Sequence, residues 1–214
     1  MDSENKLSEK TLITAILTIV AIEFLFAFIF GYTSIPDIPK VAVIRVVQVA
    51  ALITIVILLN NGLSAIGLSK GSLLKGLKKG MLWAAAFGSI TGASFVLLFF
   101  SGINPFEFFH QEQSVTMIDL VILFIVGGVI GPVAEEVFFR GFIYGFFREW
   151  GVVFGIIAST VIFAALHFKG GGLPYIQMAG GLVFAVSYEA EKSLIVPVVI
   201  HVTGNIALFT ISLV

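Results

Sequence analysis

The sequence contains no cysteine and few charged residues. The absence of cysteine from the 214 residues excludes disulfide bonds, thiolate metal sites and cysteine nucleophiles. Charged residues make up 12% of the chain, against roughly 25% in soluble domains. The formal net charge is −1, so no overall positive field favours a nucleic acid as a partner.

Apolar residues are the largest class in the composition. They make up 58% of the chain, and the mean hydropathy is +1.09. A helix needs ~20 apolar residues to cross a ~30 Å hydrocarbon core. Runs close to that length fall at 11–32, 41–60, 80–101, 117–147, 152–168, 174–190 and 194–213. The sequence therefore predicts an all-α protein, a polytopic membrane helix bundle of about seven transmembrane helices.

The first and fourth runs each allow a more specific prediction. The first run ends without a small-residue cleavage site, so we expect a retained helix rather than a signal peptide. The fourth run is too long for one straight crossing. Pro132 within it lacks a backbone N–H and can bend a helix, so we expect a broken or protruding helix there.

Lysine in the short loops predicts the orientation. Segment 61–79 carries Lys70, Lys75, Lys78 and Lys79, whereas the loop after the third run has no Lys or Arg. By the positive-inside rule, the basic loop 61–79 and the N-terminus are cytoplasmic, and the basic loop is expected to contact anionic membrane lipid. We divide the chain into N-terminal helices over 1–116 and a motif-bearing core over 117–214.

Polar side chains inside the apolar runs are the main functional signal. A charged group at the bilayer centre costs about 2.5 to 3.5 kcal/mol on insertion scales, so such groups are functional candidates by default. Six of the ten strongly polar residues in the runs lie beyond residue 130. The ten are Glu23, Arg45, Gln48, Asp119, Glu135, Glu136, Arg140, His167, His201 and Asn205. For Glu23, Arg45 and Asp119, which belong to no motif, we expect pairing within the bundle or a place near an interface.

Helical spacing groups the later residues. Glu136 and Arg140 are four residues apart and share a helix face, so they can form an ion pair. Glu135 is turned about 100° away and needs a partner from another helix. Phe163 precedes His167, and His201 precedes Asn205, by the same four-residue spacing.

One glutamate, two histidines and one asparagine from three helices can serve several functions. A carboxylate can act as general base on water, and an imidazole can hold that water. A histidine and an asparagine on one face can donate hydrogen bonds to an oxyanion. The glutamate and the two histidines can equally bind zinc with an open fourth position, or form a proton relay.

The motifs Glu135-Glu136-x-x-x-Arg140, Phe163-x-x-x-His167 and His201-x-x-x-Asn205, in this order on successive apolar segments, resemble those of the CPBP intramembrane proteases. That family includes type II CAAX prenyl endopeptidases and bacterial Abi bacteriocin-immunity proteins. The resemblance covers about the last hundred residues. It implies an intramembrane endopeptidase whose cavity lies within the bilayer and opens toward the cytosol. It also implies a multi-pass protein of a prokaryotic plasma membrane, with a peptide or lipidated protein as substrate.

The resemblance also implies residue roles. Glu135 would activate water, and His167 would position it. His201 and Asn205 would form the oxyanion site, while Glu136 and Arg140 support the motif helix.

Several alternatives stay open. No cofactor is favoured, because no third histidine or cysteine completes a closed ligand set. The alternative is a metal-dependent version of the same protease, in which Glu135, His167 and His201 bind a divalent metal such as zinc. A proton-coupled transporter and a non-catalytic immunity protein are the alternatives to an enzyme.

A shared site requires its side chains to lie at similar depths in the membrane. At 1.5 Å per residue, His201 lies ~11 Å, Glu135 ~18 Å and His167 ~23 Å from the expected cytoplasmic ends of their runs. These side chains can meet only if the helices tilt or end differently from the predicted limits.

Overall fold

The computed structural model describes residues 7–60, 62–69, 71, 73–108, 116–168 and 172–213. Within these residues the protein is all-α, with seven long helical segments, two short 3₁₀ turns (Leu63–Ile66 and Pro105–Phe108) and no strand, which confirms the predicted fold class. The segments are α1 (Glu9–Phe30), α2 (Asp37–Leu59), α3 (Leu73–Phe100), the long helix Met117–Trp150, α7 (Val152–Leu166), α8 (Tyr175–Glu191) and α9 (Ile195–Ser212). Lys70 of the predicted basic loop lies outside the described residues.

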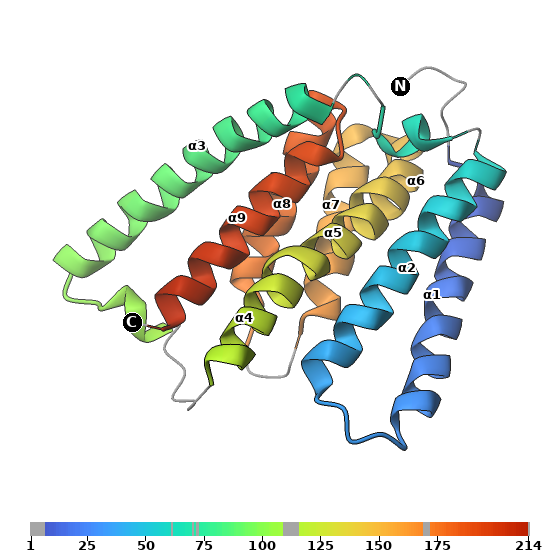
Figure 1. The fold of residues 1–214 in the computed structure, drawn as a ribbon. Coiled ribbons are helices and arrows are strands. Elements are labelled where there is room, and N and C mark those ends of the chain that lie inside the picture. Colours follow the sequence, from blue (N-terminus) through green and yellow to red (C-terminus); the bar gives the residue numbers. More distant parts are fainter. Residues whose placement is uncertain are drawn as a thin grey trace.

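The helices form a bundle around the long helix (Figure 1). In the view, α1 and α2 lie on one side of it and α9 and α3 on the other, while α7 and α8 lie behind. The first turns of α3 pack closely on α9: a Cβ added at Gly80 would lie 2.7 Å from Cβ of Val199. Small residues let two membrane helices approach in this way. Farther along, α3 diverges from α9 in Figure 1.

Among the described residues, five helices are long and apolar enough to cross a membrane. They are α1, α2, α3, Met117–Trp150 and α9. The other two predicted spans are shorter, because α7 has 15 residues and α8 has 17. At 1.5 Å per residue they reach ~22 Å and ~26 Å, short of a ~30 Å hydrocarbon core. Large apolar side chains such as Phe28 and Phe100 point outward, as expected for surfaces that face lipid.

The long helix continues past Pro132 but changes its winding. It is composed of α4 (Met117–Ile125), a π-helical turn η4 (Val126–Ile130), α5 (Gly131–Glu136), a π-helical segment η5 (Val137–Tyr144), α6 (Gly145–Phe147) and the final turn η6 (Arg148–Trp150). Wider π-helical turns inside α-helices occur often at functional sites. The expected break at Pro132 is therefore a change of hydrogen-bond register within one continuous helix.

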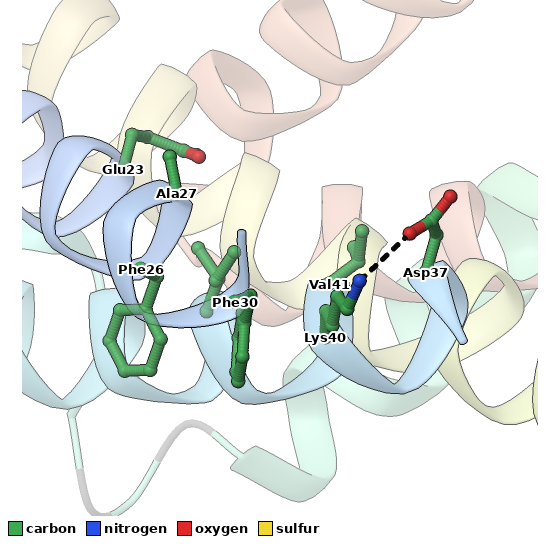
Figure 2. A pocket seen from close by; sticks show the side chains of 8 residues that line it. Glu23, Phe26, Ala27, Phe30, Asp37, Lys40 and Val41 are labelled. Atoms are coloured by element: carbon green, nitrogen blue, oxygen red, sulfur yellow. Dashed lines mark hydrogen bonds and ion pairs between the residues drawn. The ribbon is translucent and has the colours of Figure 1, made fainter. Parts of the chain in front are cut away.

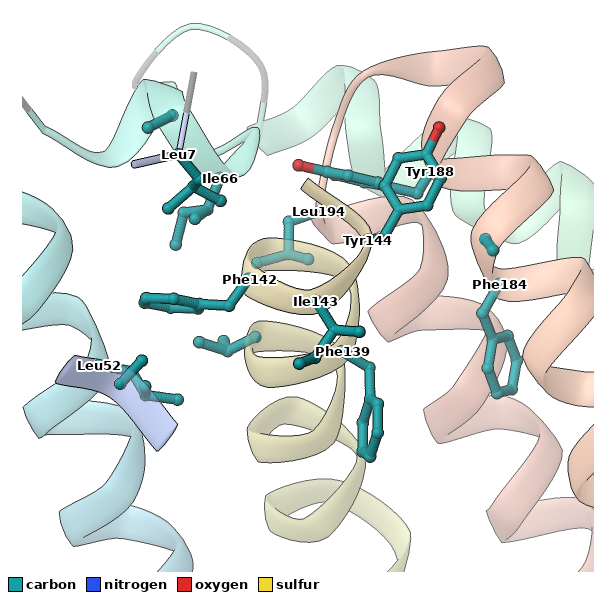
Figure 3. Packing of buried hydrophobic residues seen from close by; sticks show 14 of the residues in the cluster. Leu7, Leu52, Ile66, Phe139, Phe142, Ile143, Tyr144, Phe184, Tyr188 and Leu194 are labelled. Carbon is teal, nitrogen blue, oxygen red and sulfur yellow. The ribbon is translucent and has the colours of Figure 1, made fainter. Parts of the chain in front are cut away.

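Segment η5 supplies the centre of the apolar core. Phe139, Phe142 and Tyr144 project from it in different directions (Figure 3) and are at most 4% exposed. They meet Leu52 of α2 and Phe184 of α8 in one buried cluster. The core therefore fixes the helix that carries Glu135, Glu136 and Arg140 among its neighbours.

The polar residues of α1 and α2 pair with each other, as predicted. Oε1 of Glu23 accepts hydrogen bonds from Arg45 Nη1 at 3.3 Å and from Gln48 Nε2 at 2.9 Å. Asp119 lies at the start of α4 and forms a capping box with Thr116. These residues hold helices together or begin them.

A hollow of about 240 Å³ lies between α1 and α2, near the connection that joins them. Figure 2 shows the rings of Phe26 and Phe30 on one side and Lys40 on the other. Lys40 Nζ lies 3.3 Å from Oδ1 of Asp37, on the same helix. No residue of the predicted catalytic set lines this hollow.

The predicted basic loop is partly helical. Because α3 begins at Leu73, Lys75, Lys78 and Lys79 lie in its first turns. Lys79 Nζ lies 3.5 Å from a carboxylate oxygen of Glu191, at the end of α8. This ion pair joins the start of α3 to the α8–α9 corner.

Candidate active site

Glu135 and the two membrane histidines come together from three helices. Oε2 of Glu135, on α5, lies 3.7 Å from Nε2 of His167 and 3.8 Å from Nε2 of His201. The sequence predicted such a partner for Glu135, which its own helix could not supply. The side chains of Glu135 and His167 are 22% and 30% exposed, whereas that of His201 is 7% exposed. Water can therefore reach the cluster from the side of Glu135 and His167.

His167 is held by the residue one helical turn before it. It caps the C-terminal end of α7, and its Nδ1 lies 2.8 Å from the backbone oxygen of Phe163. A carbonyl oxygen only accepts hydrogen bonds, so Nδ1 carries the hydrogen and donates it. The Phe163 ring packs on the imidazole, with centroids 4.4 Å apart. In the neutral ring, Nε2 therefore presents a lone pair toward Glu135.

His201 is held by a carboxylate instead. Its Nδ1 lies 2.8 Å from Oε1 of Glu136, and its ring stacks on Phe184 with centroids 4.5 Å apart. Because a carboxylate accepts, Nδ1 is again the donating nitrogen. Both histidines thus bond through Nδ1 and turn Nε2 to Glu135, one backed by a neutral carbonyl and the other by a negative charge.

Glu136 and Arg140 form the predicted ion pair in the interior of the bundle. Arg140 Nη1 lies 3.0 Å from Oε1 of Glu136, and both side chains are fully buried. Nη2 of Arg140 donates to the backbone oxygen of Gly181 on α8 at 3.0 Å. The guanidinium lies 4.9 Å from the ring centre of Phe163. Charge pairing, a hydrogen bond and a cation–π contact therefore compensate for burial of this charge.

Asn205 lies on the same helix as His201, one turn further along. Its Nδ2 donates to the backbone oxygen of Gly127, in the π-helical turn η4, at 2.9 Å. The structure therefore places Asn205 against the motif helix, on the N-terminal side of Glu135. Its predicted role as an oxyanion donor stays a prediction.

Three residues of the site were not predicted from the sequence. They are Gly127, Gly181 and Phe184, which contact Asn205, Arg140 and His201 respectively. Two of these act through backbone oxygens, which no side-chain pattern can reveal. Phe184 is one of the chain's 22 phenylalanines, so its identity alone could not single it out.

A metal ion is the alternative occupant of the cluster. The chemistry of the donors suits zinc, because both Nδ1 atoms bond to oxygen acceptors and both Nε2 atoms remain available. Within the part of the chain that the structure describes, however, no group of three or more His, Cys, Asp or Glu side chains has the arrangement of a metal site.

The segment that carries the cluster is also the segment that matches a known protein family. Residues 117–207 match the family described as "Type II CAAX prenyl endopeptidase Rce1-like", a segment that contains every residue of the cluster. A protein of Bacillus subtilis (strain 168) named "Putative membrane peptidase YdiL" is 28% identical over 137 residues, which cover 58% of this chain and 53% of that protein. The chain thus aligns with about half the length of this relative.

No solved structure matches the chain. The matched residues 117–207 contain the paired glutamates, both site histidines and Asn205, and this segment is similar to the Rce1-like type II CAAX prenyl endopeptidase family.

Proposed function

We propose that the protein is an intramembrane endopeptidase that hydrolyses a peptide bond of a membrane-associated substrate. The observation that carries this proposal is the convergence of two imidazole Nε2 atoms on one carboxylate oxygen of Glu135, at 3.7 and 3.8 Å. These separations exceed a direct hydrogen bond, and one water can bond to two such groups at once. A base, a water-binding group and a candidate oxyanion donor therefore occupy one site.

Glu135 is the general base in this proposal. A water hydrogen-bonded to Oε2 of Glu135 and Nε2 of His167 gives one proton to the carboxylate as its oxygen attacks the carbonyl carbon of the substrate. His167 orients the water, because its Nδ1 is held by the carbonyl of Phe163. General base catalysis of this kind contributes typically 10²- to 10⁴-fold.

His201 and Asn205 stabilise the oxyanion of the tetrahedral intermediate. His201 donates from Nε2 when its ring is doubly protonated, and the carboxylate of Glu136 behind Nδ1 stabilises that imidazolium. Asn205 has two amide hydrogens, and one of them bonds to the backbone oxygen of Gly127. Donors fixed before the reaction are worth more than mobile ones, because they need no reorganisation as charge develops.

The intermediate then collapses with cleavage of the carbon–nitrogen bond. The proton held by Glu135 passes to the leaving nitrogen, which departs as an amine. The carbonyl carbon keeps the oxygen from water and becomes a carboxylic acid. Glu135 returns to its ionised state, so water and peptide are the reactants and no covalent enzyme intermediate is needed.

The substrate proposed is a peptide held at the membrane, and a prenylated CAAX-type carboxyl terminus is the specific candidate. The family description supports it, since it names CAAX prenyl endopeptidases. The exposed apolar surface of the helices supports a substrate that arrives through the lipid. The lysines at the start of α3 support a cytoplasmic position for that end of the bundle, and so for the N-terminus.

The test is product analysis with purified protein in liposomes. Two synthetic peptides of the same CAAX sequence, one farnesylated on its cysteine and one not, are incubated with wild type, Glu135→Gln and Glu23→Gln. Glu23 is the matched control, because it is another glutamate in an apolar helix and bonds to Arg45 and Gln48 instead of to the site. Mass spectrometry identifies the products.

We expect wild type and Glu23→Gln to release the same carboxyl-terminal fragment at similar rates, and Glu135→Gln to release it at least about 10²-fold more slowly. Cleavage of only the farnesylated peptide supports the prenyl-protein substrate. Equal cleavage of both peptides supports a broader membrane peptidase. Equal activity of Glu135→Gln and wild type would contradict the proposed role of Glu135, and proton flux in the same liposomes without cleavage would point to a transporter.

A further inference from the structure

The π-helical turn η4 removes one hydrogen bond from the motif helix. In an α-helix, the N–H of Gly131 would bond to the oxygen of Gly127, four residues earlier. Here the N–H of Gly131 bonds to the oxygen of Val126, five residues earlier. The oxygen of Gly127 therefore loses its α-helical donor.

Pro132 removes the replacement. If the five-residue register continued for one more residue, the donor to Gly127 would be the N–H of residue 132. Proline has no N–H. The oxygen of Gly127 is consequently left without its α-helical donor and without the donor that a continued π-helical register would supply. A carbonyl without a partner is costly where water cannot reach it, so a donor from another helix would stabilise it.

Asn205 of α9 supplies that donor. Its Nδ2 lies 2.9 Å from the Gly127 oxygen, and the two residues are 78 positions apart in the chain. Glycine permits this approach, because a Cβ at Gly127 would lie 3.0 Å from the ring of Phe209 on the same α9. The side chain of Asn205 is thus fixed by a backbone oxygen that is free to accept this bond, because residue 132 is proline and offers no N–H.

We infer that Pro132 is a positioning residue for Asn205, acting through the carbonyl of Gly127. The catalytic part of this inference rests on the proposed function. The structural part, that Pro132 keeps Asn205 bonded to Gly127, rests on the hydrogen-bond geometry alone. Asn205 reaches the oxyanion with its second amide hydrogen only if its first is held at Gly127. Proline at 132 keeps that anchor available, and a residue with an N–H would compete with Asn205 for it.

The test substitutes Pro132→Ala, which adds the missing N–H and removes an unfavourable residue from a helix interior. We expect the thermal unfolding midpoint in detergent to stay equal or rise, because proline disfavours helix. We expect kcat to fall by ~10²-fold with little change in KM, the size of effect that a misplacement of about 1 Å can cause. Pro36→Ala is the control, because Pro36 is the N-cap of α2 and lies outside the site. Wild-type kcat in Pro132→Ala would overturn the catalytic part of the inference.

A double-mutant cycle separates this inference from the proposed function. If Pro132 acts through Asn205, the kcat of Pro132→Ala/Asn205→Ala equals that of Asn205→Ala alone, since coupled residues are not additive. If the kcat losses of the two single variants instead multiply in the double variant, the inference is overturned.

The same double-mutant cycle can be measured with thermal unfolding midpoints, which does not require the protein to be an active enzyme. Asn205→Ala should lower the midpoint in the wild-type background and leave it unchanged in the Pro132→Ala background. An equal drop in both backgrounds would overturn the inference even if the protein proved not to be a peptidase. Wild type that cleaves nothing, together with a cycle that shows coupling, would contradict only the proposed function.

Discussion

Nδ1 of His201 lies 2.8 Å from Oε1 of Glu136, and the same oxygen lies 3.0 Å from Nη1 of Arg140. One buried carboxylate oxygen thus holds both the guanidinium that anchors the motif helix to α8 and the imidazole that faces Glu135. The second glutamate of the motif is therefore connected to the site through His201. Its contribution to activity can be separated from its contribution to stability.

Glu136→Gln tests the orientation of His201. The amide oxygen of glutamine can still accept from Nδ1, but it lacks the negative charge that stabilises an imidazolium. We predict a fall in kcat of about 10- to 100-fold, by analogy with the range found for carboxylates behind metal-ligating histidines. KM should change little, because Glu136 is fully buried. Steady-state kinetics check this, with Glu191→Gln at the far end of α8 as control, and a large rise in KM with kcat unchanged would contradict it.

Arg140→Met tests the buried ion pair through stability. Removal of one partner leaves the charge of Glu136 uncompensated, and we predict a loss of about 3 to 5 kcal/mol in the free energy of unfolding. The double substitution Glu136→Gln/Arg140→Met leaves no buried charge and should recover part of that loss. Denaturant unfolding in detergent measures both. Additive losses in the double variant would show that the two residues stabilise the bundle independently.

His167→Gln and His167→Asn test which ring nitrogen acts. The amide of glutamine reaches about as far as Nε2 of histidine, while that of asparagine reaches about as far as Nδ1. Because Nδ1 is bonded to Phe163 and Nε2 faces Glu135, we predict more residual activity in His167→Gln than in His167→Asn. Hydrolysis rates of the two variants under identical conditions decide the point, and the reverse order would place the active nitrogen at Nδ1.

Chelation tests the metal alternative. If Glu135 acts on a water that only protein residues hold, a chelator such as 1,10-phenanthroline should leave the hydrolysis rate unchanged. Loss of activity in the chelator, with recovery on addition of zinc, would instead assign Glu135, His167 and His201 as ligands. A soluble zinc peptidase assayed in parallel confirms that the chelator is effective.

Much of the site could be predicted because its residues carry local signals. Ionisable groups in apolar runs are conspicuous, and the four-residue spacing of Glu136 and Arg140 indicates their contact directly. The need of Glu135 for a partner on another helix follows from the angle between adjacent helical residues. The structure confirms both the pair and the partners.

The remaining features depend on the path of the backbone. Depths measured along straight helices separated His201 and His167 by about 12 Å, yet both rings reach one oxygen of Glu135. Shifted helix ends do not explain this, since α7 begins at Val152 as predicted and α9 begins at Ile195, one residue after the predicted limit. The helices therefore do not run straight and level with one another, as the depth estimate assumed. The π-helical turns likewise leave no pattern in residue type, so the link from Asn205 to Gly127 could only be found in the structure.

The most direct measurement of the central claim is the rate of peptide hydrolysis by Glu135→Gln relative to wild type in the same liposomes, with Glu23→Gln alongside. Since Glu135 is proposed as the general base, the account predicts a loss of about 10²-fold or more in kcat for Glu135→Gln and a rate close to wild type for Glu23→Gln. Hydrolysis by Glu135→Gln at the wild-type rate would contradict it.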